Sequence, residues 1–360
     1  MLLRRVASTA RGASPLSVRS YIIYVMCAAG CWVCQQPSDA MMTDMCRILA
    51  YVGSALPVQS LLVDPENSLI NQALDPEAHP LLQLAGWGFG GWSEHLLRPE
   101  EPFRYRRPMA AFYDDNVEGI IPSLSASTLI AHVRAAAYDA GVALVDENCH
   151  PFSFRGAPWL VAHNGVLPGW KLLQRELLAH CEDRFLEQMR GTTDTEFLYV
   201  LLASLMQGDG DDDVQAAFET SLQLILGAMR KLDLVALTKM KMALIAPNRM
   251  IGVNLGFGHE GETEVDADWR DLRTADAGTP EHDLSMVLEP LYLLTGTGFE
   301  DYEDSYDVNP TPPEDATSAI FASEPLTDTA EDWTHIEFGQ MVSVERTGDG
   351  LRRRIVDLDL

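Results

Sequence analysis

The sequence predicts an α+β layered domain in which helices cover paired sheets. Three observations lead to this prediction. An apolar, strand-like run at 46–52 opens the main body, helical spacing dominates 169–232, and the last third returns to short strand-like runs. With 360 residues, of which 47% are hydrophobic and 22% charged, the chain has the composition of an ordinary globular protein with enough apolar material for a large core.

The charge balance is strongly acidic. The chain carries 53 Asp and Glu against 26 Lys and Arg, which gives a formal net charge of −27. Such a charge argues against nucleic acid and against an anionic membrane surface as partners of the folded domain, and it favours solubility. The six cysteines have no regular spacing beyond a lone Cys31–Cys34 pair, so no disulfide framework is expected. Reduced thiols in a cytoplasmic compartment fit this pattern best.

No bound cofactor and no metal site are expected. The nine histidines include no HExxH pair, and His150 follows Cys149 too closely for the usual tetrahedral zinc pattern. The glycine-rich stretch AGWGFGGW at 85–92 has the wrong spacing for a nucleotide-binding fingerprint. Its glycines instead allow a neighbouring backbone, or a ligand, to approach a strand closely.

Residues 1–44 differ in composition from the rest and are treated as a leader, with the main domain at 45–360. The leader is rich in Arg and Ser, has no acidic residue before Asp39, and contains an apolar run at 21–34 that is shorter than the roughly 20 residues of a membrane span. Three interpretations remain: the true start is Met41, Met42 or Met45; the leader is an organellar or secretory targeting segment; or it is a self-cleaved propeptide. We favour the first, with an organellar location as the alternative if the second holds.

Strands are expected where short apolar runs end in turn residues. Asn-Gly is common in hairpins, so His163-Asn164-Gly165 is predicted to end its strand in a turn. The single strands are expected at 46–52, 85–92, 127–137, 159–162 and 318–324, and the hairpins at 242–246 with 250–253 and at 341–346 with 352–357.

Helices are expected in the middle of the chain. The apolar spacing predicts helices within 169–190, from Phe197 to about Met206, and from Asp213 to Leu232. Thr193 and Glu196 have the spacing of a capping box ahead of the second helix. The acidic, turn-rich stretches near 259–283 and 300–315 are expected to be solvated insertions.

Cys46 becomes a candidate nucleophile if Met45 is the start site and is removed. An N-terminal cysteine carries a thiol and an α-amine on one residue, and the amine, with a reference pKa of about 8, can act as the base for its own thiol. Elsewhere, Arg134 offers a planar fork for a carboxylate, although such an arginine alone is usually a structural or surface ion pair. The Asn164 amide and the Gly165 backbone N–H could together hold an oxyanion.

Five segments, taken in order, resemble the class II glutamine amidotransferases, which are N-terminal-nucleophile hydrolases with a four-layer αββα sandwich. The segments are MCRILAYVG from Met45, HVRAAA at 132–137, NCHPF at 148–152, HNG at 163–165 and TTDTE at 192–196. The later SEPLTDTAEDW at 323–333 is similar to stand-alone members of that family. Each motif is weak alone, whereas the ordered set is specific.

The resemblance implies a role for each matching residue. Cys46 would be the nucleophile and its α-amine the base; Asn164 and Gly165 would donate to the oxyanion; Arg134 would bind the substrate's α-carboxylate and Asp194 its α-ammonium group. The family often has Thr or Ser where this chain has Ala137, which is expected to affect substrate affinity more than chemistry.

The function implied by the resemblance is hydrolysis of the side-chain amide of glutamine, or of a γ-glutamyl compound, through a cysteine thioester that releases glutamate. One alternative is a glutaminase subunit that delivers ammonia to a separate synthetase. Another is an inactive binding or scaffold protein, if the leader stays attached and blocks Cys46. A thiol protease with His132, His150 or His163 as base fits less well, because Arg134 and Asp194 suit recognition of an amino-acid head group.

Overall fold

The computed structural model describes residues 46–74, 83–135, 143–234, 236–259, 291–302, 305–327 and 329–359. These residues belong to one compact unit, Asp44–Leu360. The expected leader, Ala137 and all but the first residue of the first acidic insertion lie outside the described residues.

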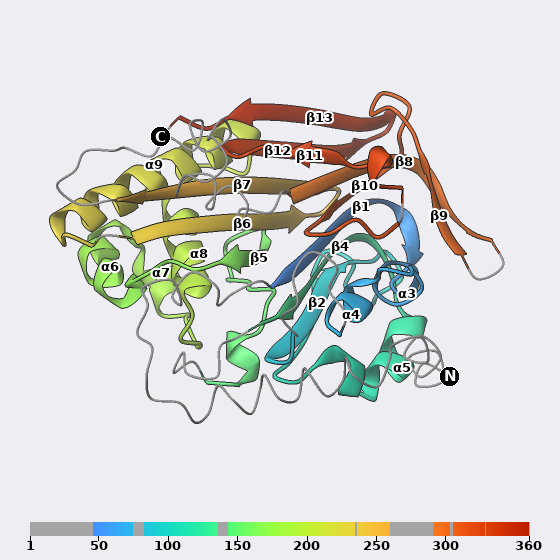
Figure 1. Ribbon diagram of the computed structural model, residues 1–360, viewed down its shortest axis with the longest axis horizontal. Helices are drawn as coiled ribbons and strands as arrows, with labels where there is room; N and C mark the ends of the chain where they lie inside the picture. The colour runs from blue at the N-terminus through green and yellow to red at the C-terminus, as the bar shows by residue number, and fades with distance from the viewer. Residues whose placement is uncertain are drawn as a thin grey trace, which may run out of the picture. The chain divides into compact units, whose positions relative to one another are not determined.

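The larger of two sheets has the strand order β11-β8-β10-β1-β4-β2-β3, with β9 paired to β8, and its pairings are antiparallel. The strands β1 and β4 lie at its centre (Figure 1). The bounds are β1 Arg47–Pro57, β2 Gly86–Trp92, β3 Phe103–Arg107, β4 Ser125–Arg134, β8 Leu291–Tyr302, β9 Ser305–Pro310, β10 Ser318–Ala322 and β11 Thr334–Ile336.

The second sheet is also antiparallel and has the order β13-β12-β7-β6-β5. Its strands are β5 Leu160–Gly165, β6 Ala236–Ala246, β7 Arg249–His259, β12 Gln340–Thr347 and β13 Gly350–Asp357. The inner faces of the two sheets pack against each other through a shared apolar core, in which Ile48, Ala50 and Val52 of β1 meet residues such as Ala243 and Ile245 of β6.

Helices cover the outer face of each sheet. The long helices α8 and α9 and the shorter α6 pack on the second sheet over a large apolar core, and short helices lie beside β1 and β4 (Figure 1). The α-helices are α3 Gln59–Leu62, α4 Leu69–Gln72, α5 Asn116–Ile120, α6 Trp170–Leu177, α7 Asp183–Leu186, α8 Asp194–Leu205 and α9 Asp211–Lys231. The 3-10 helices are η2 Ala111–Tyr113, η3 Ile121–Ser123, η4 Asp146–Asn148, η5 Leu178–His180 and η6 Ala330–Asp332. The layers are helix, sheet, sheet and helix, as the sequence predicted.

The composition of β1 explains its central position. Its residues from Arg47 to Val52 are at most 1% exposed on both faces, because one face meets the second sheet and the other is covered by helices. Fully burying one leucine- or isoleucine-sized side chain contributes about 1.5–3 kcal/mol. An uninterrupted apolar run is therefore favourable here, whereas a strand with one solvated face would alternate.

Most predicted elements are confirmed, and one is wrong. The strands and both hairpins form, and α9 begins two residues before its predicted start at Asp213. The predicted turn at His163-Asn164-Gly165 is wrong, since these residues extend β5 and pair with Met242, Lys241 and Met240 of β6. A partner strand that continues past residue 162 outweighs the turn preference of Asn-Gly.

The start of α8 follows the predicted capping box in part. The Thr193 hydroxyl accepts a hydrogen bond from the Glu196 N–H at 3.2 Å, so the helix begins at Asp194, three residues before Phe197. The Glu196 carboxylate instead accepts from the N–H groups of Arg190 and Gly191. Within the stretch 300–315, residues up to Tyr302 and from Ser305 form the β8–β9 hairpin.

None of the helices within the described residues is long and apolar enough to cross a bilayer.

Candidate active site

The predicted nucleophile lies at one end of the space between the two sheets. Cys46 directly precedes β1, and the pairing of Arg47 with Val133 places it opposite Arg134, the last residue of β4. Cys46 has the same strand parity as Ile48 and Ala50, which face the second sheet, so its side chain lies on the inner face. It is 7% exposed, and its Sγ donates to the Ala135 carbonyl oxygen at 3.6 Å.

The second sheet contributes Asn164 and Gly165 at the end of β5. Asn164 is buried, and its Nδ2 donates to the carbonyl oxygen of Cys46, which joins the two sheets at this point. A primary amide has two N–H donors, so one contact to Cys46 leaves the second N–H for another acceptor. Gly165 has φ = 153°, a conformation that L side chains rarely adopt.

Arg134 is a buried cation beside Cys46. It is 7% exposed, and its Nη1 has no hydrogen-bond partner within the part of the chain that the structure describes. A buried guanidinium N–H without a partner is costly, and a planar carboxylate is the ligand that fits it best. The Arg134 charge also lowers the pKa of His132 and His150, which adds to the larger effect of burial.

Asp194 is fixed at the first turn of α8. One carboxylate oxygen accepts from the Leu167 N–H and the other from the Thr195 N–H, both at 2.8 Å. The Thr195 hydroxyl lies 3.0 Å from Nδ1 of His163, the residue before Asn164. The structure thus joins Asn164 to Cys46 by a hydrogen bond and places Arg134 opposite Cys46 on the neighbouring strand. Gly165 follows Asn164 in β5, and Asp194 is connected to this strand through Thr195 and His163.

Three buried histidines surround this end of the sandwich, and sequence reasoning gave them no role in the preferred function. The ring centroids of His132 and His150 are 4.0 Å apart, and His163 lies on β5 of the second sheet. Burial lowers the pKa of all three, that of His132 to about 3. A glycine makes this packing possible, because a Cβ on Gly88 would collide with the carbonyl oxygen of His150.

Because burial lowers the pKa of these histidines, we expect the folded protein to lose stability in acid. The unfolded chain, with histidine pKa values near 6.5, binds more protons than the folded chain below that pH, so the free energy of unfolding falls as the pH falls. His132 alone is expected to contribute a slope of about 1.4 kcal/mol per pH unit between pH 6 and 4. Chemical denaturation across this range should show a smaller slope in His132→Gln than in wild type. An equal change in slope in the exposed control His95→Gln would contradict this assignment.

A buried ion pair supports the backbone of Cys46 from the other face of the sheet. The Arg47 guanidinium is fully buried and pairs with the Glu324 carboxylate, whose side chain is 3% exposed. Nη1 of Arg47 also donates to the Cys46 carbonyl oxygen at 3.4 Å. The Ile48 N–H donates to the Ser323 hydroxyl, and the Ser323 N–H donates to the Ile48 carbonyl oxygen, both at 3.0 Å.

Sequence reasoning missed this pair, although it had singled out both segments. The signal was an arginine directly after the candidate nucleophile and a glutamate in SEPLTDT, two charges that are separated by most of the chain. Among the described residues, no group of three or more His, Cys, Asp or Glu has the arrangement of a metal site.

The residues of this site lie largely within one family match. Residues 81–232, which include Arg134, Asn164 and Asp194, match the model of the glutamine amidotransferases class-II. Over these residues the chain is similar to the class II glutamine amidotransferases. Cys46 lies ahead of the matched residues, so the match does not bear on its role.

Two relatives of this chain carry the names of enzymes. The chain is 30% identical over 174 residues to a probable glutamine amidotransferase, DUG3, of Saccharomyces cerevisiae, a match that covers 47% of each chain. It is 32% identical over 125 residues to the gamma-glutamyl-hercynylcysteine sulfoxide hydrolase of Mycobacterium tuberculosis, covering 34% of this chain and 50% of the relative. The chain thus spans about half the length of the curated relatives it matches.

The fold agrees with that of a solved structure. A glutamine aminotransferase class-II domain protein from Silicibacter pomeroyi superposes with a TM-score of 0.50 at 14% sequence identity, and the match covers 86% of this chain and 98% of that one. This similarity establishes the four-layer fold.

Proposed function

We propose that this amidotransferase hydrolyses the side-chain amide of a γ-glutamyl compound and releases glutamate. The observation that carries the proposal is the convergence of Cys46, Asn164 and the buried Arg134 at one end of the inter-sheet space. The proposal includes the condition that Cys46 is the first residue of the active form, so that its α-amine is free.

The head group of the substrate is held by opposite charges. Arg134 is buried and has an N–H without a partner among the described residues, which supports binding of the α-carboxylate. Asp194 is held by two backbone N–H groups, which fix its carboxylate for the α-ammonium group. A γ-glutamyl compound carries both groups on one carbon, so the two contacts orient the γ-carbonyl toward Cys46.

The chemistry takes two acyl-transfer steps. The Cys46 thiol attacks the γ-carbonyl carbon while its α-amine accepts the thiol proton, directly or through a water. The second N–H of Asn164 and the Gly165 N–H stabilise the oxyanion. The C–N bond then breaks, the leaving amine takes the proton, and a thioester remains. Water adds to the thioester by the same route and releases glutamate with a free thiol.

Glutamine and γ-glutamyl amides of thiol compounds are the substrate class that we propose. One relative is named as a hydrolase of a γ-glutamyl sulfoxide compound and another as a probable glutamine amidotransferase, which supports a γ-glutamyl amide without choosing its leaving group. All the proposed contacts, from the nucleophile to the head-group residues, are made to the glutamyl part of the substrate. They therefore do not select the leaving group.

The test uses protein that begins at Cys46, made by expressing residues 45–360 and checked by mass spectrometry. Glutamate release from glutamine and from γ-glutamyl thiol compounds is expected, and Cys46→Ala should abolish it. Asn164→Ala is expected to lower kcat about 10²–10³-fold, because one oxyanion donor is lost. Absence of turnover on every compound, with the amine confirmed free, would refute the proposal. Release of ammonia from glutamine only in a complex with a co-purified synthetase would favour the glutaminase-subunit alternative.

A further inference from the structure

A pocket lies between the two sheets, at the end away from Cys46. It has a volume of about 380 Å³ and is lined by Ala55, Trp92, Ser93, Glu94, Pro99, Ser127, Pro247, Asn248 and Arg346. The strands β1, β2 and β4 each have one end at this pocket and the other end at the candidate active site. Ala55 follows Cys46 by nine positions along β1, which corresponds to roughly 30 Å, so the pocket is a separate site.

Packing and hydrogen bonds hold several residues that line the pocket in place. Trp92 is 6% exposed and belongs to the core between the sheets. The β6–β7 turn is tied to the other sheet, because the Asn248 N–H donates to the Thr128 hydroxyl at 3.1 Å. Asn248 also accepts a hydrogen bond from the Arg346 N–H through its carbonyl oxygen, at 2.8 Å, which fixes the turn against β12. The lining groups are thus held by both sheets.

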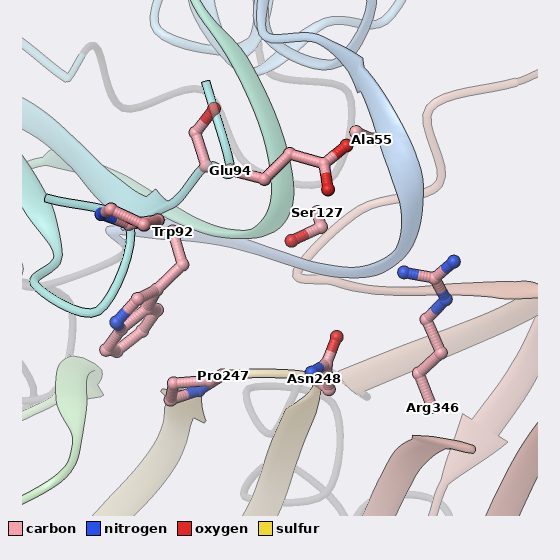
Figure 2. Close-up of a pocket in the computed structure, with 9 residues that line it drawn as sticks. Ala55, Trp92, Glu94, Ser127, Pro247, Asn248 and Arg346 are labelled. Carbon is pink, nitrogen blue, oxygen red and sulfur yellow. The ribbon is translucent and has the colours of Figure 1, made fainter. Parts of the chain in front are cut away.

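Two opposite charges line this pocket, Glu94 from the turn after β2 and Arg346 from β12. Figure 2 shows Glu94 and Ser127 on one side, and Asn248 and Arg346 on the other. Among the described residues, Glu94 has only a distant contact of 3.8 Å to the neighbouring His95, and the structure gives Arg346 no ion pair.

Two of the other three arginines on the same hairpin, unlike Arg346, have ion pairs. Arg352 pairs with Glu345, and Arg354 pairs with Asp212 at 2.6 Å. Carboxylates outnumber cationic side chains by 53 to 26 in this chain, yet the structure gives Arg346 no carboxylate partner among the described residues, so its guanidinium is available for an external anion.

We propose that this pocket binds the zwitterion of a free α-amino acid with an apolar side chain. The Arg346 guanidinium binds the α-carboxylate, for which its planar fork is suited. Glu94, assisted by the Ser127 hydroxyl, binds the α-ammonium group. The apolar side chain lies on the Trp92 indole between Pro99 and Pro247. A volume of about 380 Å³ lies at the small end of the range for ligand sites, which suits a single amino acid.

The experiment is isothermal titration calorimetry of the full chain with L-leucine, N-acetyl-L-leucine and L-leucinamide. L-leucine is expected to bind, and each derivative, which lacks one charge, should bind about 10-fold more weakly or worse. Arg346→Gln and Glu94→Gln should each weaken L-leucine binding to the same degree, whereas the matched control Arg352→Gln should not. The substituted side chains are solvent-exposed, and a thermal melt confirms that each variant is folded.

Asp194→Asn separates this pocket from the candidate active site, where the proposed function also places an amino-acid head group. L-leucine binding that persists in Asp194→Asn and is lost in Arg346→Gln supports the proposal. The reverse pattern, unchanged affinity in Arg346→Gln and Glu94→Gln, or no binding at millimolar L-leucine would overturn it. Each of these outcomes is independent of whether the enzyme releases glutamate.

Discussion

Protein that begins at Cys46 is expected to release glutamate about 10²–10⁴-fold faster than the same protein with Met45 retained. A free α-amine with a pKa near 8 can take the thiol proton, whereas the nitrogen of an amide bond has no basicity. The position of Cys46 adds a steric reason: it is 7% exposed between Ala135 and Asn164, so a preceding residue competes for the space beside the thiol.

The comparison needs two preparations that differ by one residue, each checked by intact mass. Steady-state kcat with a γ-glutamyl substrate is the measurement, and Cys181→Ala is the control for a second, half-buried thiol far from the site in sequence. Equal kcat in the two preparations would show that another group takes the thiol proton. The buried histidines would then be the first candidates.

The layered fold could be predicted from the sequence because its strands are buried on both faces. In β1, an apolar run without alternation indicated a strand inside a layered structure, and the periodicity of α9 gave its length to within two residues at its start. The pairing of strands was beyond the sequence. Antiparallel partners such as β1 and β10 are separated by most of the chain, and nothing local in either strand specifies the other.

The candidate site shows a similar division. Asn164 was predicted as an oxyanion donor on its resemblance to a motif, yet its strand was predicted to have ended, because Asn-Gly favours turns when no partner strand is considered. The Arg47–Glu324 pair was missed for the converse reason. A charged residue next to a nucleophile suggests solvent exposure, and only the tertiary structure shows that a carboxylate from the other end of the chain reaches it.

Glu324→Gln is expected to lower the free energy of unfolding by about 3–5 kcal/mol. It removes the carboxylate of the pair and keeps the buried Arg47 guanidinium, which is the costly way to break a buried ion pair. Denaturant unfolding followed by fluorescence is the measurement. Glu101→Gln is the matched control, because its ion pair with Arg98 is exposed and should contribute no more than about 1 kcal/mol.

The double variant Arg47→Met with Glu324→Gln tests whether the loss of stability in Glu324→Gln comes from the buried charge or from altered packing. Removing both charges is expected to recover most of the lost stability, since an apolar side chain of similar length can occupy the same buried space. Activity should not recover with it. Arg47 donates to the Cys46 carbonyl oxygen, so the double variant loses that hydrogen bond and keeps the one from Asn164. A lower kcat with a nearly unchanged KM in a stable double variant would assign the pair to positioning Cys46. Restored stability together with restored kcat would limit its role to the fold.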